Sequence, residues 1–323
     1  TVKSNWRRRM DLNASNAYDW SGHKLYVPVG QVQQYRNDPG IAAAWNEYSD
    51  VSAGAFDFTT GNDFMTTMYR MTVVNPTTKT AKYVYNWGTG SASINAVNNK
   101  TDHLTGITYT MVEIGDSCWA NPNTVYKSVN FSVSSTITRI GAYAFQNCMG
   151  LNTEVSVPES VTEIGKNAFY GCTSLPSVFL NRSSGTTAVY PNLFSSSQQT
   201  ILYVPLNRFY NVANQTSGWL ANSASNRRLL PYVKPTTEWS AISVPVSDNI
   251  LLPASGEFYY APSFNTGNYS LGKTQIGNSQ GIKGGEGMLM KGTVGTVYRF
   301  RRNDAVSNYS YVSPRTNYLK GIT

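Results

Sequence analysis

The most specific chemical pattern in this sequence is a match to a phosphate-binding loop. Residues 267–274, GNYSLGKT, have the spacing Gly-x-x-x-x-Gly-Lys-Thr, in which backbone amides and a lysine hold phosphate groups. Such a loop must follow a buried strand and begin a helix, because the helix N-terminus directs its amides at the phosphate. Here Pro262 precedes the match, and residues 275–279 do not favour a helix. We therefore expect no nucleotide site.

Histidine and carboxylate side chains are too sparse to form a recognisable catalytic group. His23 and His103 lie in polar, turn-like segments without a nearby cysteine or Glu-x-x-His pattern, so neither a metal site nor a histidine-dependent triad is expected. Glu154 and Glu163 are a carboxylate pair of the kind used in glycoside hydrolysis. We expect Glu159 and Glu163 to lie instead on solvated turns. The sequence thus predicts no catalytic, metal-binding or cofactor-binding residue, and no cofactor.

The three cysteines belong to an internal repeat. They form no Cys-x-x-Cys unit, and residues 140–151 align with residues 164–175 at an offset of 24, with Ile, Gly, Ala, Phe, Cys and Leu at matching positions. More divergent copies begin at Ile114 and Val189. A period of roughly 20–29 residues with apolar residues at fixed positions is typical of a leucine-rich solenoid. Four coils are therefore visible.

The repeat predicts which residues lie inside each coil. We expect one strand per coil, as in Val155–Val157 and Val178–Leu180, stacked in a parallel sheet. Gly141 and Gly165 are expected at tight turns. The residues predicted to be buried are the aromatic ones at one repeat position and all three cysteines: Trp119, Phe145, Phe169, Phe194, Cys118, Cys148 and Cys172. Cys148 and Cys172 are expected to be packed too tightly to form a disulfide.

The predicted fold is mainly β with short helices: a short leucine-rich repeat solenoid with a parallel sheet of ~24-residue coils, followed by a small C-terminal β domain. Residues 1–50 are predicted to be the closing coil and cap of a preceding repeat unit, and residues 51–105 a β-hairpin lead-in with its turn at 75–78. Residues 106–233 are predicted to be the repeats with a C-terminal cap, and residues 238–323 the β domain. Leu202–Pro205 is expected to be the last strand of the solenoid.

Composition and charge exclude several classes of protein. The 323 residues include 22 Tyr, 12 Phe and 7 Trp, which supply enough apolar surface for a core and exclude disorder. No stretch approaches the ~20 apolar residues of a membrane span, and residues 1–9 lack the apolar segment of a signal peptide. The net charge of +8 is compatible with an acidic partner. The basic residues are scattered and accompany no recognised module, so we expect no nucleic-acid binding.

The segment 161–175, VTEIGKNAFYGCTSL, closely resembles the BspA-like leucine-rich repeat family of bacterial surface proteins. The Leu-Tyr-Val-Pro segments at 25–28 and 202–205 and the strand ending in Ile114–Gly115 are similar to the same family, and residues 281–292 resemble the β domain that often follows such repeats. The resemblance implies a secreted or outer-surface location, here without a signal segment, and adhesion without catalysis. The implied partners are a host matrix protein or glycan, or another bacterial surface.

Two alternatives stay open. The Tyr-rich β domain is compatible with a glycan-processing enzyme or its accessory carbohydrate-binding module, since exposed tyrosines stack on sugar rings. The small number of coils is compatible with a structural spacer that presents other modules. The candidate binding residues are the tyrosines of the β domain that fall outside the repeat: Tyr259, Tyr260, Tyr309 and Tyr311.

Overall fold

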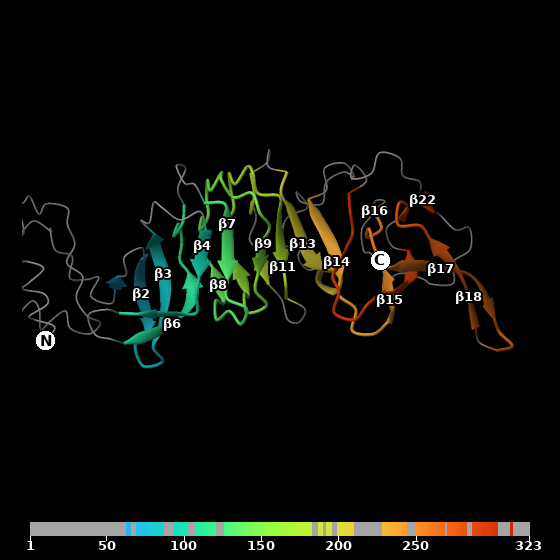
Figure 1. Ribbon diagram of the computed structural model, residues 1–323, viewed down its shortest axis with the longest axis horizontal. Helices are drawn as coiled ribbons and strands as arrows, with labels where there is room; N and C mark the ends of the chain where they lie inside the picture. Colours follow the sequence, from blue (N-terminus) through green and yellow to red (C-terminus); the bar gives the residue numbers. More distant parts are fainter. Residues whose placement is uncertain are drawn as a thin grey trace, which may run out of the picture.

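Short β-strands make up most of the computed structural model, and they follow one another along its long axis (Figure 1). The structure describes residues 63–65, 69–86, 93–102, 107–120, 126–182, 187–189, 192–195, 199–209, 228–243, 250–268, 270–282, 286–302 and 311–312. The closing coil predicted for residues 1–50 lies outside these ranges. The four predicted domain boundaries therefore stay predictions.

The solenoid is mainly β, as predicted, but each coil contributes two strands rather than one. One sheet contains the parallel strands β6 (Thr108–Ile114), β8 (Arg139–Ile140), β10 (Glu163–Ile164) and β12 (Ala188–Val189). The other contains the parallel strands β9 (Val155–Val157), β11 (Ser177–Leu180), β13 (Ile201–Pro205) and β14 (Leu229–Val233). Strands β8, β10 and β12 have two residues each, too few to show an alternating pattern in the sequence.

The second sheet also extends beyond the strand that was predicted to close it. Strand β13 does contain Leu202–Pro205, and the 3-10 helix η3 (Leu206–Arg208) follows it. Strand β14 then adds to β13 in parallel, with Leu202 opposite Leu229. The prediction that β13 ends the sheet was wrong. All five residues of β14 are buried, and their removal from water favours the addition of this strand to the sheet.

An antiparallel hairpin precedes the coils. Its strands β2 (Tyr69–Asn75) and β3 (Thr80–Asn86) enclose the expected turn, where the Asn75 side chain accepts hydrogen bonds from the Thr77 and Thr78 amides. Strand β3 pairs in parallel with β6 and so connects the hairpin to the first sheet. The remaining strands of this region are β1 (Asp63–Met65), β4 (Ser93–Ala96), β5 (Asn99–Thr101) and β7 (Ser128–Phe131).

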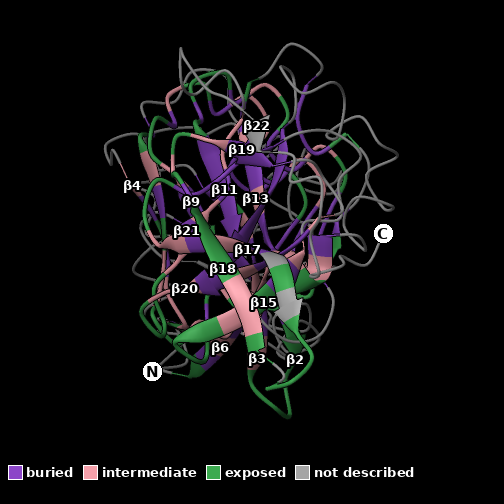
Figure 2. Ribbon diagram, turned by 90° about the vertical axis from the view of Figure 1, so that its right-hand side faces the viewer, coloured by how far each residue is buried: buried purple, intermediate pink, exposed green. Residues whose placement is uncertain are grey.

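A continuous stack of aromatic rings fills the centre of the coils. Trp119 stacks on Phe145 with ring centroids 5.4 Å apart, and Phe145 stacks on Phe169 at 5.0 Å. Phe169 meets Phe194 at 6.4 Å. All four rings and the three cysteines are buried and the cysteines are free, which confirms the predicted repeat positions. Figure 2, which looks along the row of coils, shows the buried residues gathered inside them.

Glycine is required in the coils because the backbones of successive coils approach closely there. A Cβ atom on Gly165 would lie 2.5 Å from the amide nitrogen of Ala142 in the preceding coil. Gly141 and Gly165 are not among the glycines with positive φ. The left-handed conformation falls two residues later, at Tyr143 (φ 58°) and Asn167 (φ 56°). The two glycines do lie at tight turns, as predicted: turns follow at residues 142–147 and 166–171, and the Gly165 carbonyl accepts a hydrogen bond from the Ala168 amide.

The C-terminal part forms two further sheets and returns to the solenoid. Strand β21 (Tyr298–Arg299) pairs antiparallel with β14, and both Arg299 Nη atoms lie 2.7 Å from the Glu154 carboxylate oxygens. One sheet has the order β15-β20-β17-β18, and the other β16-β19-β22. Their strands are β15 (Trp239–Ser243), β16 (Ile250–Leu251), β17 (Glu257–Asn265), β18 (Ser270–Ile276), β19 (Gly281–Ile282), β20 (Gly287–Lys291) and β22 (Tyr311–Val312).

Candidate functional site

One face of the β15-β20-β17-β18 sheet carries an aromatic pair that is partly exposed to solvent. Trp239 pairs across the sheet with Lys291, and Tyr259 with Leu289, so alternation places these four side chains on one face. The opposite face is apolar and lies in a second core that contains Ile242, Phe258, Ile276, Met288 and Met290. The Trp239 and Tyr259 ring centroids are 5.5 Å apart, and Trp239 is 38% exposed. The sheet thus presents two neighbouring rings to solvent.

Two lysines flank these rings. The Lys273 Nζ atom from β18 lies 4.2 Å from the Trp239 ring centroid and 5.9 Å from that of Tyr259. The Lys291 Nζ atom lies 5.8 Å from the Trp239 centroid, 3.5 Å from Glu238 and 3.8 Å from Glu257. We call Trp239, Tyr259, Lys273 and Lys291 the aromatic–lysine face. It combines flat apolar surfaces with hydrogen-bond donors and acceptors.

A carboxylate orients the hydroxyl of this face. The Tyr259 hydroxyl donates a hydrogen bond to Glu257, and this bond raises the pKa of Tyr259 above its usual value because it favours the protonated form. Glu257 also faces Lys291. The hydroxyl of Tyr259 therefore stays neutral, and its position on the face is fixed.

The structure separates the tyrosines that the sequence grouped together. Tyr259 lies on the aromatic–lysine face, whereas Tyr260, one residue later, packs against the second core on the other side of the sheet. Tyr309 lies outside the described residues, and of Tyr311 only the backbone in β22 is described. Whether any of them contacts a ligand stays a prediction.

Trp239 and Lys273 were not singled out as binding residues from the sequence. Trp239 marked the point where the repeat pattern is lost, and Lys273 belonged to the phosphate-loop match. The structure places residues 267–274 in a β-hairpin: Lys273 and Thr274 lie within β18, with no helix after them in the described residues. The absence of a nucleotide site stays a prediction. The sequence signal that could have found Trp239 is its alternation with the buried Ile242 and its position at a strand start.

The carboxylates considered for catalysis are engaged in ion pairs. Glu163 lies in strand β10 and accepts a hydrogen bond from Arg139, which also pairs with Glu113, so its predicted place on a turn was wrong. Glu159 lies on a turn, as predicted. Both histidines lie outside the described residues, within which no group of three His, Cys, Asp or Glu side chains could hold a metal ion. In that part of the chain, no helix has the length and apolar character needed to cross a membrane.

The succession of coils corresponds to a known repeat type. A model of the "BspA type Leucine rich repeat region" matches residues 104–216 in six copies. Residues 104–216 are a BspA-type leucine-rich repeat region. Proteins with BspA-type repeats are bacterial cell-surface proteins and are generally non-enzymatic.

Solved structures with similarity to this chain are also leucine-rich repeat proteins. A leucine-rich repeat protein from Bacteroides capillosus is 19% identical over 44% of this chain and 98% of its own, with a TM-score of 0.36. A leucine rich cell surface protein from Faecalibacterium prausnitzii is 20% identical over 44% of each chain, with a TM-score of 0.33. The T. pallidum leucine-rich repeat protein is 17% identical over 45% of this chain and 72% of its own, with a TM-score of 0.31. No curated protein matches the chain.

Proposed function

We propose that this protein is a non-enzymatic binding protein of a bacterial surface and that it attaches to a glycan through the aromatic–lysine face. The observation that carries the proposal is the Trp239–Tyr259 pair on the solvent side of a sheet, in which Trp239 is exposed and Tyr259 is half-buried. An exposed Trp usually marks a recognition surface, because leaving so large an apolar group in water is unfavourable. The BspA-type repeats support a surface location and an adhesive role.

The chemistry of the face suits sugar rings. The apolar C–H side of a pyranose stacks on an aromatic ring, and two rings 5.5 Å apart offer a platform for adjacent sugar units. The ammonium of Lys291 and the carboxylate of Glu238 lie beside Trp239 and provide a donor and an acceptor for hydroxyl groups. The sequence led us to expect a host matrix protein, a glycan or another bacterial surface as the partner. Matrix proteins and bacterial surfaces also carry glycans, so a glycan is the ligand that these partners have in common.

The alternative of a glycan-processing enzyme has less support. Glycoside hydrolysis uses two carboxyl groups on either side of the scissile bond. Glu154 is held by the two nitrogens of Arg299, and Glu163 by Arg139, so each is committed to a structural ion pair. Glu163 belongs to one sheet of the coils, and Glu154 lies beside the other. No observation favours the spacer, which becomes an outcome of the test below.

The experiment is a binding measurement on immobilised mucin, glycosaminoglycan and neutral polysaccharide at physiological salt. We expect saturable binding to at least one of them and at least tenfold weaker binding by Trp239→Ala, by analogy with the stacking of a nucleic-acid base on an aromatic side chain, which contributes on the order of 1–3 kcal/mol. The matched control is Tyr85→Ala, which removes a 50% exposed aromatic residue from the lead-in hairpin and should change affinity less than twofold.

Three results would contradict the proposal. Failure to bind any of the glycans would leave the spacer as the better account. Equal loss of binding in Trp239→Ala and Tyr85→Ala would show that the aromatic–lysine face is not the contact surface. New reducing ends after incubation with the glycans would identify an enzyme.

A further inference from the structure

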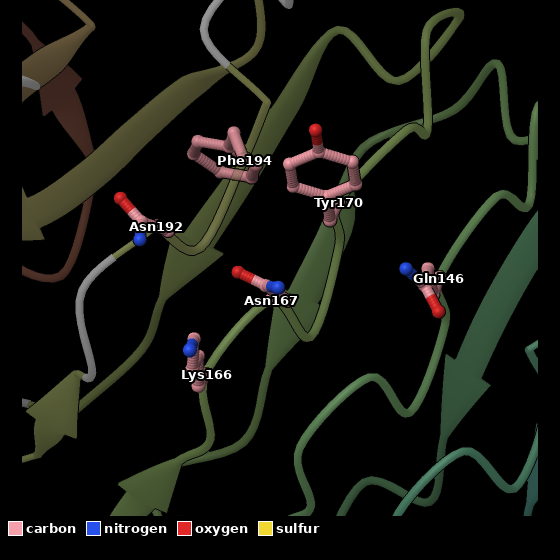
Figure 3. Close-up of a pocket in the computed structure, with 6 residues that line it drawn as sticks. All are labelled: Gln146, Lys166, Asn167, Tyr170, Asn192 and Phe194. Carbon is pink, nitrogen blue, oxygen red and sulfur yellow. The ribbon is translucent and has the colours of Figure 1, made fainter.

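A second concave site lies on the solenoid itself, away from the aromatic–lysine face. It is a pocket of about 540 Å³ beside the turns that follow strands β8, β10 and β12 (Figure 3). A volume in this range is typical of small-molecule sites. The lining side chains come from three successive coils: Gln146, Lys166, Asn167, Tyr170, Asn192 and Phe194.

The backbone of the coils explains why carboxamides meet here. Asn167 and Asn192 each precede the stacked phenylalanine of their coil by two residues, and both adopt a left-handed conformation, with φ of 56° and 60°. Asparagine is one of the few non-glycine residues that tolerates this conformation. Since the same turn recurs in each coil, the two side chains emerge on the same edge of the solenoid, where Figure 3 shows them side by side.

The lining groups are rich in donors and contain no carboxylate. Lys166 is exposed and contributes an ammonium group, while Gln146, Asn167 and Asn192 contribute carboxamides. Tyr170, which is 38% exposed, contributes aromatic surface and a hydroxyl, whereas the ring of Phe194 is buried. A positive charge without an acidic neighbour in the lining favours an anionic ligand, and the carboxamides favour a ligand with several hydroxyl groups.

One polar atom at this site lacks a partner. The Oδ1 atom of Asn167 is buried and accepts no hydrogen bond. Buried acceptors are nearly always satisfied, and an unsatisfied one calls for a missing donor.

We propose that this turn-edge pocket binds one anionic sugar residue of an acidic glycan. Its acidic group pairs with Lys166, its hydroxyls bond to the carboxamides of Asn167 and Asn192, and an apolar side of the ring packs on Tyr170. Both a carboxylated and a sulfated sugar have this chemistry. The proposal does not depend on the aromatic–lysine face, because the two sites share no residue.

The test uses the full chain and three soluble probes with one core: lactose, sialyllactose and sulfated lactose, titrated by ligand-observed NMR and calorimetry. We expect saturable binding of one or both acidic probes, at least tenfold tighter than lactose, and weakening as NaCl rises from about 50 to 300 mM. The better acidic probe identifies the acidic group. Lys166→Gln should reduce its affinity at least tenfold, and Lys166→Arg should retain most of it.

Controls separate this site from the proposed surface function. Lys127→Gln removes another exposed lysine of the repeat region and should leave probe affinity within twofold. Unchanged melting temperature of Lys166→Gln would establish that the variant is folded. Equal affinity for lactose and the acidic probes, no effect of Lys166→Gln, or no saturation up to about 10 mM probe would each overturn the proposal. Loss of probe binding in Trp239→Ala alone would assign the sugar to the aromatic–lysine face instead.

Discussion

The thiol of Cys172 donates a hydrogen bond to the main-chain carbonyl of Phe145 in the preceding coil, with Sγ and O 3.0 Å apart. Cys148 makes the same contact with Trp119 one coil earlier, at 3.1 Å. Each cysteine follows the stacked aromatic residue of its own coil by three positions, so its thiol reaches the carbonyl of the aromatic residue one coil back. Cysteine at this position therefore packs as a small apolar side chain and also links successive coils.

The first prediction concerns these thiols. Because all three cysteines are buried, a thiol reagent should label them slowly in the native protein and completely in denaturant. Cys172→Ala should lower the free energy of unfolding by about 1–2 kcal/mol, through the lost packing and hydrogen bond. Cys118→Ala is the control, since alanine occupies the equivalent positions 144 and 168. This substitution should lower the free energy of unfolding by less than about 1 kcal/mol. Fast labelling of all three thiols without denaturant would contradict the repeat alignment that places the cysteines inside the coils.

The second prediction concerns the glycines between coils. Gly115→Ala would place a Cβ atom 2.5 Å from the carbonyl oxygen of Tyr83, and Gly165→Ala would place one 2.5 Å from the amide nitrogen of Ala142. Backbone atoms cannot move aside without separating the coils, so each variant should lose about 2–3 kcal/mol of stability in urea denaturation. Gly267→Ala, whose nearest neighbour is the mobile side-chain oxygen of Asn265 at 3.3 Å, should stay within about 0.5 kcal/mol of wild type. A similar loss in all three variants would contradict the close-approach explanation.

The third prediction concerns the junction between the solenoid and the C-terminal sheets. Besides its two bonds to Glu154, the Arg299 guanidinium lies 4.7 Å from the Phe179 ring and 4.9 Å from the Tyr203 ring. A double-mutant cycle of Arg299→Ala and Glu154→Gln should give a coupling of about 1–2 kcal/mol, because the pair is partly exposed to solvent. Arg299→Lys should retain only part of this stability, since a lysine cannot bond both oxygens in a fork. Additive effects of the two substitutions would mean that the ion pair does not stabilise the junction.

The fourth prediction concerns alkaline pH. Burial raises the pKa of the Cys118 thiol, and burial together with nearby Tyr69 raises the pKa of Tyr126 to about 12. In the unfolded chain these groups ionise near pH 8.5 and 10, so above each of these values the unfolded state binds fewer protons than the folded state. Stability should be full below about pH 8, begin to fall above about pH 8.5, and fall further between about pH 10 and 12.

The measurement is the melting temperature as a function of pH. Cys118→Ala removes one group that titrates first and should therefore weaken the decline from about pH 8.5 upward, above pH 10 as well, because the thiol of the folded protein keeps its proton there. A melting temperature that stays constant up to pH 11 would show that these side chains are accessible to solvent in the folded protein.

The residues inside the coils could be predicted from the sequence. Phe145 and Phe169 recur at one repeat position with Cys148 and Cys172 at another, and all four are buried. A residue that recurs at a fixed interval must occupy the same place in every coil, and an apolar one must face the interior, so periodicity alone determines burial. The hairpin around the Asn75 turn was predictable for a similar local reason, since its side chain caps the turn amides.

The candidate sites, in contrast, were decided by the tertiary structure. Trp239, Tyr259 and Lys273 lie on three strands of a sheet whose order, β15-β20-β17-β18, does not follow the chain. Asn167 and Asn192 meet Tyr170 only because successive coils stack in register. The outward-facing residues of the β15-β20-β17-β18 sheet are not constrained by a repeated core, so they carry no period in the sequence. Their neighbours are set by strand pairing and coil stacking, which bring distant residues together only when the chain is folded.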